Sequence, residues 1–328
     1  MPADRDPRAW WLDDDPFDKK DYTERRNNKT TKTSSNSFEQ NPFQDILIVF
    51  RLFYLLINIF ILQLIQVAHA ETEQVIRQGG LYLEEISEKD SQMHIMHDSN
   101  RLTTIEFNQK YYLLYGIPYN TKIGAHTVEV TANNKKRFIR MNLKSKKFDT
   151  QYIKIANKYI SPSTNTLSRI EKERANISRA KEMWLNSNPD IKFIKPVDGI
   201  TTGTYGTKRF YNNEEGNYHN GLDIAAPTGT HILSPSSGKV ILTGDYYYNG
   251  KFIYLDHGKG LKSIFIHLDK ILVETGQIIT KGEVIGEVGN SGASAGPHLH
   301  WSVMLNKTYI DPEIFLNHRI IRYFSLED

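Results

Sequence analysis

Two short segments in the C-terminal third carry residues that could bind a metal ion. His219-Asn-Gly-Leu-Asp223 places an imidazole four residues before a carboxylate, and His298-Leu-His300 places two imidazoles two residues apart. A catalytic zinc site typically has three protein ligands, His nitrogen or carboxylate oxygen, at roughly 2.0–2.2 Å and one open position. His219, Asp223 and one His of the later pair give that number. The sequence therefore predicts a zinc site, with the other His of the pair free to face a substrate.

The composition restricts the alternatives. The chain has no Cys, which excludes disulfides, thiol catalysis and Cys-ligated zinc, so any metal must use His and carboxylates. Lys and Arg number 41 against 38 Asp and Glu, for a net charge of +3 in 328 residues. This surplus is too small and too evenly spread to favour nucleic acid as a partner.

Strands and turns are expected to position these side chains. Residues two apart in a strand share a face, so His298 and His300 should point the same way. Gly221 and the run Ala225-Ala-Pro227 favour a loop that enters a strand over a helix between His219 and Asp223. The region 191–328 contains short alternating apolar runs separated by glycines, which is typical of an antiparallel β fold with tight turns.

Several motifs of this region resemble, in order, those of the lysostaphin- or LytM-type zinc endopeptidases, over about Thr201 to Leu316. They are His219-x-x-x-Asp223, Asp223-Ile-Ala-Ala-Pro-Thr-Gly229, Leu255-Asp-His-Gly258, Ile266-His-Leu268 and Gly296-Pro-His-Leu-His-Trp301. The resemblance implies a mainly β protein whose peptidase domain is the antiparallel LytM-type sheet with a duplicated hybrid motif. It also implies three zinc ligands, His219, Asp223 and His300, and two catalytic histidines, His267 and His298.

In that family pattern, His267 and His298 act on the zinc-bound water and the developing oxyanion; which of them is the base stays open. Arg209 resembles a position ahead of the metal motif in Gram-negative members, and it is expected to bind substrate or to order the groove. Phe265 and Asp269 depart from the common Tyr and Ser or Thr, and neither is a predicted ligand.

Peptidoglycan is the substrate that the resemblance implies. Hydrolysis would cut its stem peptides or cross-bridges, and the bond, D-Ala to diaminopimelate or a glycine bridge, stays open. Two alternatives are a non-catalytic LytM-like module that activates or scaffolds other cell-wall hydrolases, and a secreted adhesin that uses zinc only to brace its fold. The intact set of five predicted site residues favours the enzyme.

The region upstream divides into a small β domain at 71–160 and a linking helix at 161–190. Alternating runs such as Thr127-Val-Glu-Val130 and Arg137-Phe-Ile-Arg140 predict the strands, and apolar residues at helical spacing among charges predict the helix. Intramolecular inhibition, with the β domain covering the groove, is an open alternative.

The N-terminal residues suggest export. Residues 1–45 are polar and are expected to be disordered. Residues 46–68 are almost continuously apolar, and Ala68-His69-Ala70 resembles a cleavage site, so 46–70 is either a signal peptide or a hydrophobic helix that anchors the chain in the membrane. Both interpretations place the rest in the periplasm or cell envelope, and an uncleaved segment would anchor it to the inner membrane.

Overall fold

The chain folds mainly into β-strands, which confirms the predicted fold class. The computed structural model describes residues 57, 75–316 and 319–320. Contacts divide the chain into two units, and every described residue except Ile57 belongs to the unit that includes residues 74–326.

The predicted polar tail at 1–45 and the predicted signal or anchor at 46–70 lie outside the described residues, apart from Ile57, and both stay predictions. Among the helices that the structure does describe, none has the length and apolar character needed to cross a membrane.

Two sheets form upstream of residue 150. One has the strand order β1-β8-β7-β3-β4 and the other β2-β6-β5. Strand β8 shows why they form, because Ile139, Met141 and Leu143 are buried while the residues between them are exposed, the period of a half-covered strand. The elements are β1 (Ile76–Arg77), β2 (Leu81–Ile86), α2 (Glu88–Ser91), β3 (Met96–His97), β4 (Asn100–Arg101), β5 (Thr103–Phe107), β6 (Lys110–Gly116), β7 (Gly124–Ala132) and β8 (Lys135–Lys144).

Two helices follow, α3 (Asn157–Ile160) and α4 (Thr164–Glu182), and α4 packs against β15 (Gly238–Tyr246). Of the residues of α4 only Ile170 and Ala180 are buried, so most of its charged side chains face solvent. The predicted linking-helix range 161–190 thus contains α4 and, after it, an irregular segment at 183–190.

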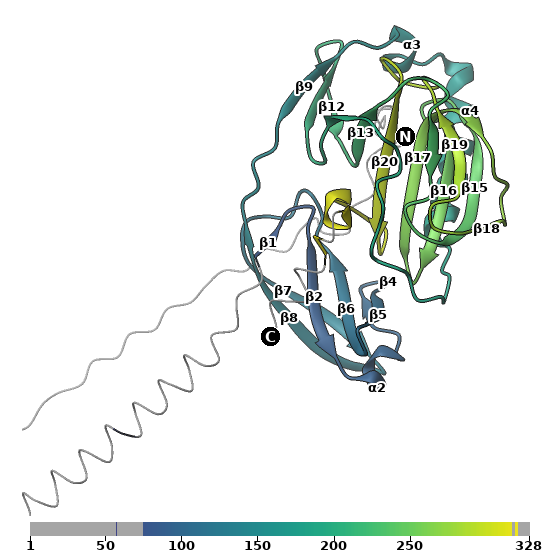
Figure 1. The fold of residues 1–328 in the computed structure, drawn as a ribbon. Helices are drawn as coiled ribbons and strands as arrows, with labels where there is room; N and C mark the ends of the chain where they lie inside the picture. The colour runs from purple at the N-terminus through teal and green to yellow at the C-terminus, as the bar shows by residue number, and fades with distance from the viewer. Residues whose placement is uncertain (1–56, 58–74, 317–318, 321–328) are drawn as a thin grey trace, which may run out of the picture. The chain divides into compact units, whose positions relative to one another are not determined.

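The C-terminal region forms a ten-stranded sheet with the main order β10-β13-β20-β17-β16-β15-β18 (Figure 1). All its neighbouring strands are antiparallel, as the glycine-punctuated runs predict. Its other elements are β10 (Ile200–Gly203), β13 (Leu222–Ala225), β14 (His231–Leu233), β16 (Gly250–Gly258), β17 (Leu261–Ile271), β18 (Ile278–Ile279), β19 (Val284–Val288), β20 (His298–Leu305), β21 (Thr308–Ile310) and the 3₁₀ helix η2 (Pro312–Ile314).

A three-stranded sheet joins the upstream region to the C-terminal region. Its order is β12-β11-β9, with β9 (Thr150–Ile153) parallel to β11 (Lys208–Tyr211), which is antiparallel to β12 (Glu214–Tyr218). In Figure 1 the chain runs from β8 up to β9, which lies at the edge of this small sheet. A strand upstream of the predicted boundary at residue 160 is therefore hydrogen-bonded to the predicted peptidase domain.

The hydrophobic core is also shared between the two regions. One cluster of buried side chains contains Leu83 and Leu114 of the β2-β6-β5 sheet together with Phe265 and Trp301 of the ten-stranded sheet. Burial of this apolar surface favours the packed arrangement of the two sheets.

His257 is a buried histidine of β16 whose protonation should weaken the fold. Its Nδ1 donates to the Ser237 carbonyl at 2.9 Å, and its Nε2 lies 2.8 Å from Ser263 Oγ. Burial lowers the pKa of His257 to about 4. Because an unfolded His titrates near pH 6.5, the unfolded chain takes up this proton first as the pH falls. The stability that neutral His257 contributes is therefore present above about pH 6.5 and is lost between about pH 6.5 and pH 4.

Between pH 7 and pH 4.5 the free energy of unfolding should fall in both the native chain and His257→Gln. We expect the fall to be about 2–3 kcal/mol smaller in His257→Gln, since Gln does not titrate. Urea unfolding at the two pH values measures this. The comparison is between the two proteins' changes with pH, because other buried histidines contribute with the same sign. Equal changes in both proteins would contradict the assignment.

Candidate metal centre

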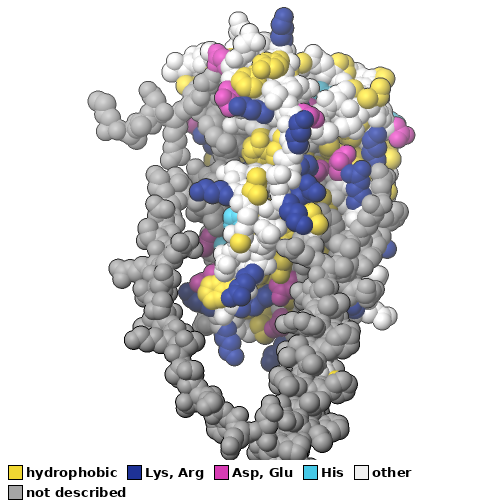
Figure 2. Space-filling view, turned by 90° about the vertical axis from the view of Figure 1, so that its left-hand side faces the viewer, with side chains coloured by type: hydrophobic (Ala, Val, Ile, Leu, Met, Phe, Trp, Pro, Cys, Tyr) yellow, Lys and Arg dark blue, Asp and Glu magenta, His cyan; other side chains and the backbone are white. Residues whose placement is uncertain are grey.

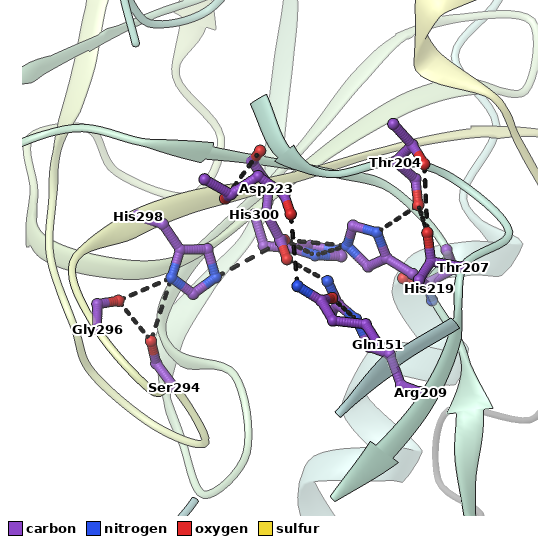
Figure 3. Close-up of polar contacts among 12 residues, drawn as sticks. Gln151, Thr204, Thr207, Arg209, His219, Asp223, Ser294, Gly296, His298 and His300 are labelled. Carbon is purple, nitrogen blue, oxygen red and sulfur yellow. Dashed lines mark hydrogen bonds and ion pairs between the residues drawn. The ribbon is translucent and has the colours of Figure 1, made fainter. Parts of the chain in front are cut away.

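Three buried side chains from two segments meet beside the β13–β20 pair (Figure 3). The antiparallel register places Asp223 directly opposite His300, and His219 lies in the segment that leads into β13. His219 Nε2 lies 3.0 Å from Asp223 Oδ1 and 2.9 Å from His300 Nδ1, and His300 Nδ1 lies 2.9 Å from Asp223 Oδ1. Within the part of the chain that the structure describes, no other group of three His or acidic residues has metal-binding spacing.

Hydrogen bonds outside this cluster determine which nitrogen of each imidazole carries the proton. The Thr204 carbonyl can only accept, so His219 Nδ1 donates to it at 2.8 Å. Ser302 Oγ donates to Asn220 Oδ1 at 3.3 Å and lies 2.8 Å from His300 Nε2, so it accepts from that nitrogen. His219 Nε2 and His300 Nδ1 are therefore unprotonated in the neutral rings.

The cluster fits a divalent metal ion. Two nitrogen lone pairs and a carboxylate oxygen face one another, which is unfavourable unless a cation lies between them. A tetrahedral ion with ligands at roughly 2.0–2.1 Å keeps its ligand atoms about 3.3 Å apart, close to the spacing of these three atoms. Two histidines and one aspartate provide three protein ligands, which leaves the fourth coordination position of the ion open for catalysis.

Electrostatics keep the three groups in the deprotonated forms that metal binding needs. Burial by itself would raise the pKa of Asp223, but His219 and Arg209 outweigh burial and hold that pKa well below its ordinary value. Burial lowers the pKa of His219, and it lowers the pKa of His300 to about 4. At neutral pH a metal ion would therefore not compete with protons for these ligands.

Arg209 contacts residues of the site itself. Its Nη2 donates to Asp223 Oδ2, its Nε donates to Gln151 Oε1 at 3.1 Å, and it is only 7% exposed. The guanidinium thus holds the oxygen of Asp223 that does not face the histidines. The substrate contact that the sequence suggests for Arg209 stays a prediction.

His298 lies beside the three-residue cluster, on the same side of β20 as His300. Its Nδ1 donates to the Gly296 carbonyl at 2.8 Å, and its Nε2 lies 3.6 Å from Asp223 Oδ1. The orientation is visible in Figure 3, where the ring points toward Asp223. Because Nδ1 carries the proton in the neutral ring, Nε2 is the nitrogen that can accept one.

His267 has the same arrangement from another strand. Its Nδ1 donates to the Ser291 carbonyl at 2.8 Å, and its ring centroid lies 5.0 Å from that of His298. Burial, together with His298 and His300, keeps the pKa of His267 well below its ordinary value. His267 is therefore neutral at pH 7, with Nε2 as the acceptor.

The backbone at His267 is unusual for a strand. Its φ is 68°, in the left-handed region, and the β17–β19 pairing shifts register just after it, between Leu268 and Lys270. Non-glycine residues rarely adopt this conformation, and such irregularities in strands re-aim side chains, often at functional sites. The alternation of β17 alone therefore does not predict where His267 points.

One pocket of about 310 Å³ is lined by all six residues that the sequence analysis selected, His219, Asp223, His300, His267, His298 and Arg209. Its other walls include Tyr211 and residues 293–297, and also three upstream residues, Gln151, Ile153 and Ile155. Figure 2 shows basic, acidic and apolar side chains interspersed on one face of the molecule.

The sequence analysis did not identify the residues that form hydrogen bonds with the proposed metal ligands or with Arg209. Ser302 could have been found, because it lies two residues after His300 and must share its face in a strand. Thr204 acts through its backbone carbonyl, which any residue type offers. Gln151 lies 58 residues before Arg209, and no spacing rule connects them.

Two other histidines and Phe265 lie outside this cluster. His231 on β14 is exposed, and His97 is buried upstream with its Nδ1 2.9 Å from the Glu129 carbonyl. Phe265 is fully buried in the core and does not line the pocket, so its ring is not in position to contact a substrate there.

Comparison with known proteins agrees with this geometry. The model of Peptidase family M23 matches residues 217–312, which include the three clustered residues. A Pseudomonas aeruginosa chain of known structure, assigned to peptidase M23, is 34% identical; the alignment covers 73% of this chain and 94% of that chain, with a TM-score of 0.60. The likeness therefore extends upstream of residue 217.

Two curated relatives are similar over a shorter stretch. The peptidoglycan DD-endopeptidase ShyB of Vibrio cholerae is 39% identical over 93 residues, or 28% of this chain and 22% of ShyB. The DD-carboxypeptidase/endopeptidase Mpg of Neisseria meningitidis is 34% identical over 94 residues, 29% of this chain and 22% of Mpg. This chain thus spans about a fifth of the length of these relatives. With the likeness to nearly all of the Pseudomonas chain, the matches confirm the predicted resemblance, and the protein belongs to peptidase family M23.

Proposed function

We propose that this protein is a zinc-dependent endopeptidase that hydrolyses peptide cross-links of peptidoglycan. The observation that carries the proposal is the meeting of His219, Asp223 and His300 in one pocket with two further histidines, His267 and His298, whose Nδ1 atoms face backbone carbonyls and leave Nε2 as the possible proton acceptor. Membership in family M23 and the names of ShyB and Mpg support peptide bonds of peptidoglycan as the substrate class.

In this mechanism His219, Asp223 and His300 would hold the ion. Zinc supplies Lewis acidity, which polarises a carbonyl and makes water more acidic. The Nε2 atom of one of these two histidines, His267 or His298, accepts the proton of the attacking water and returns it to the leaving amine, while the other imidazole stabilises the carbonyl oxygen. The Gly296 and Ser291 carbonyls keep these rings in the accepting tautomer.

The location of the proposed substrate supports the proposal that this protein works in the cell envelope. Peptidoglycan lies outside the cytoplasmic membrane, so the predicted export segment at 46–70 is consistent with this function. We place the catalytic region in the periplasm or cell envelope, and a fusion of a periplasm-sensitive reporter to the C-terminus would test that location.

The decisive test of the function combines metal analysis with a digest of purified sacculi. We expect about one zinc per chain, and conversion of cross-linked muropeptide dimers to monomers. A chelator should stop the conversion and added zinc should restore it, because the ligands remain in place. A fully metal-loaded protein that leaves the dimers intact would instead favour the non-catalytic module, and the mass of the products identifies the bond that is cut.

A further inference from the structure

Strand β9 brings a side chain from the upstream region into contact with the metal centre. The parallel β9–β11 register places Gln151 beside Arg209. Arg209 Nε donates to Gln151 Oε1 at 3.1 Å, and Gln151 Nε2 lies 3.4 Å from the Thr202 carbonyl. In Figure 3 the Gln151 and Arg209 side chains lie together below the Asp223 carboxylate.

Arg209 also interacts with Tyr211, and its contacts with Gln151 and Asp223 have a directional consequence. A guanidinium is planar, so acceptors at Nε and at Nη2 together set the position of its plane. One acceptor is Gln151 Oε1 and the other is Asp223 Oδ2. A guanidinium fixed at both atoms keeps Oδ2 of the carboxylate in place and leaves Oδ1 turned toward His219 and His300.

Burial makes the contact with Gln151 consequential. Arg209 is 7% exposed, and a buried N–H without an acceptor is costly, so an Arg209 that lost Gln151 would shift toward another acceptor. A shift of the guanidinium would loosen its hold on Asp223 and allow the carboxylate to turn.

We propose that Gln151 is a positioning residue of the metal centre, which acts through Arg209 to orient the Asp223 carboxylate. This rests on the proposed metal site but not on the identity of the substrate. It extends the functional unit to residues 150–155, upstream of the 217–312 segment that matches the family model. The alternation of this segment agrees with that role, since Gln151, Ile153 and Ile155 all line the pocket while Tyr152 is 70% exposed.

Two substitutions of similar size separate hydrogen bonding from simple filling of space. Gln151→Leu removes the acceptor oxygen, and Gln151→Glu keeps one at the same place. We expect Gln151→Leu to weaken zinc binding by about threefold to tenfold, less than the roughly 10- to 100-fold typical of groups bonded directly to a ligand. Gln151→Glu should stay within about twofold of the native affinity or exceed it.

The measurement is competition with a chromogenic chelator, in the whole chain and without peptidoglycan. Tyr152→Ser is the control, because it changes the same strand on its other face and should leave affinity unchanged. In the cobalt-substituted protein, Gln151→Leu should also change the visible absorption bands, since these follow the geometry of the carboxylate ligand. Thermal unfolding of the metal-free proteins checks the fold, and Gln151→Ala replaces the Leu variant if the latter does not fold.

Native affinity and a native spectrum in the folded apolar variant would overturn the proposal, as would equal weakening by Gln151→Glu or failure of the native chain to bind either metal. Failure of the sacculus digest alone would overturn the peptidase function and leave this result standing. The two proposals are therefore tested separately.

Discussion

Replacing His300 by Ala is expected to abolish zinc binding and peptidoglycan hydrolysis together. His300 Nδ1 lies within 2.9 Å of both His219 Nε2 and Asp223 Oδ1, so its removal leaves two ligands where a catalytic site needs three. The Lewis acid contributes several kcal/mol to transition-state stabilisation, and about 4 kcal/mol corresponds to about a thousandfold in rate. We therefore expect activity to fall by at least about a thousandfold.

The measurement pairs zinc content after dialysis with the rate of dimer cleavage in sacculi. His231→Ala is the matched control, since it makes the same substitution at an exposed histidine of β14 and should retain both properties. The metal-free forms of the native and His300→Ala proteins should both give a folded circular dichroism spectrum, because the cluster lies beside an intact core. Full activity of His300→Ala would refute the ligand assignment.

The sequence alone could predict much of the centre because its residues lie in strands with short, local patterns. The two-residue period places His298 and His300 on one face, and Gly221 marks a turn before the strand that carries Asp223. Periodicity could not show that Asp223 lies directly opposite His300, because strand register depends on the partner strand. The family motifs implied that both residues are ligands of one ion, without giving the register.

The contribution of the upstream region could not be predicted in this way. β9 has only four residues and pairs with β11, whose residues follow about 58 positions later. Such non-local pairing depends on tertiary packing, and a short alternating run does not show which strand it will pair with. The predicted boundaries at 160 and 190 followed changes in the local sequence pattern, whereas the hydrogen bonds of β9 and the shared core connect residues on both sides of them.

The left-handed residue in β17 shows a second limit. A regular strand would place His267 on the face of Phe265, two residues earlier, yet Phe265 is buried in the core while His267 lines the pocket. The φ of 68° and the adjacent register shift account for the difference. The sequence predicted that His267 belongs to the site through the Ile266-His-Leu268 motif, and no periodicity would have done so.

His298→Ala is expected to keep zinc and lose rate. His298 Nε2 lies 3.6 Å from Asp223 Oδ1, outside the triangle of atoms at 2.9–3.0 Å, so a metal ion held by that triangle does not depend on it. Removing a general acid–base group typically costs about 10²- to 10⁴-fold. The loss should appear in kcat with little change in KM, since His298 is assigned to the reaction and not to binding.

His267 should behave in the same way, but its substitution has to respect the backbone. Ala at a φ of 68° would be strained, whereas Asn adopts the left-handed region more readily, so His267→Asn is the cleaner variant. Zinc content near one per chain with a rate reduced by about 10²-fold or more in each variant would support two proton-transfer groups beside the metal. Loss of zinc from His298→Ala with its retention in His300→Ala would exchange their roles, because only a ligand is needed to retain the ion.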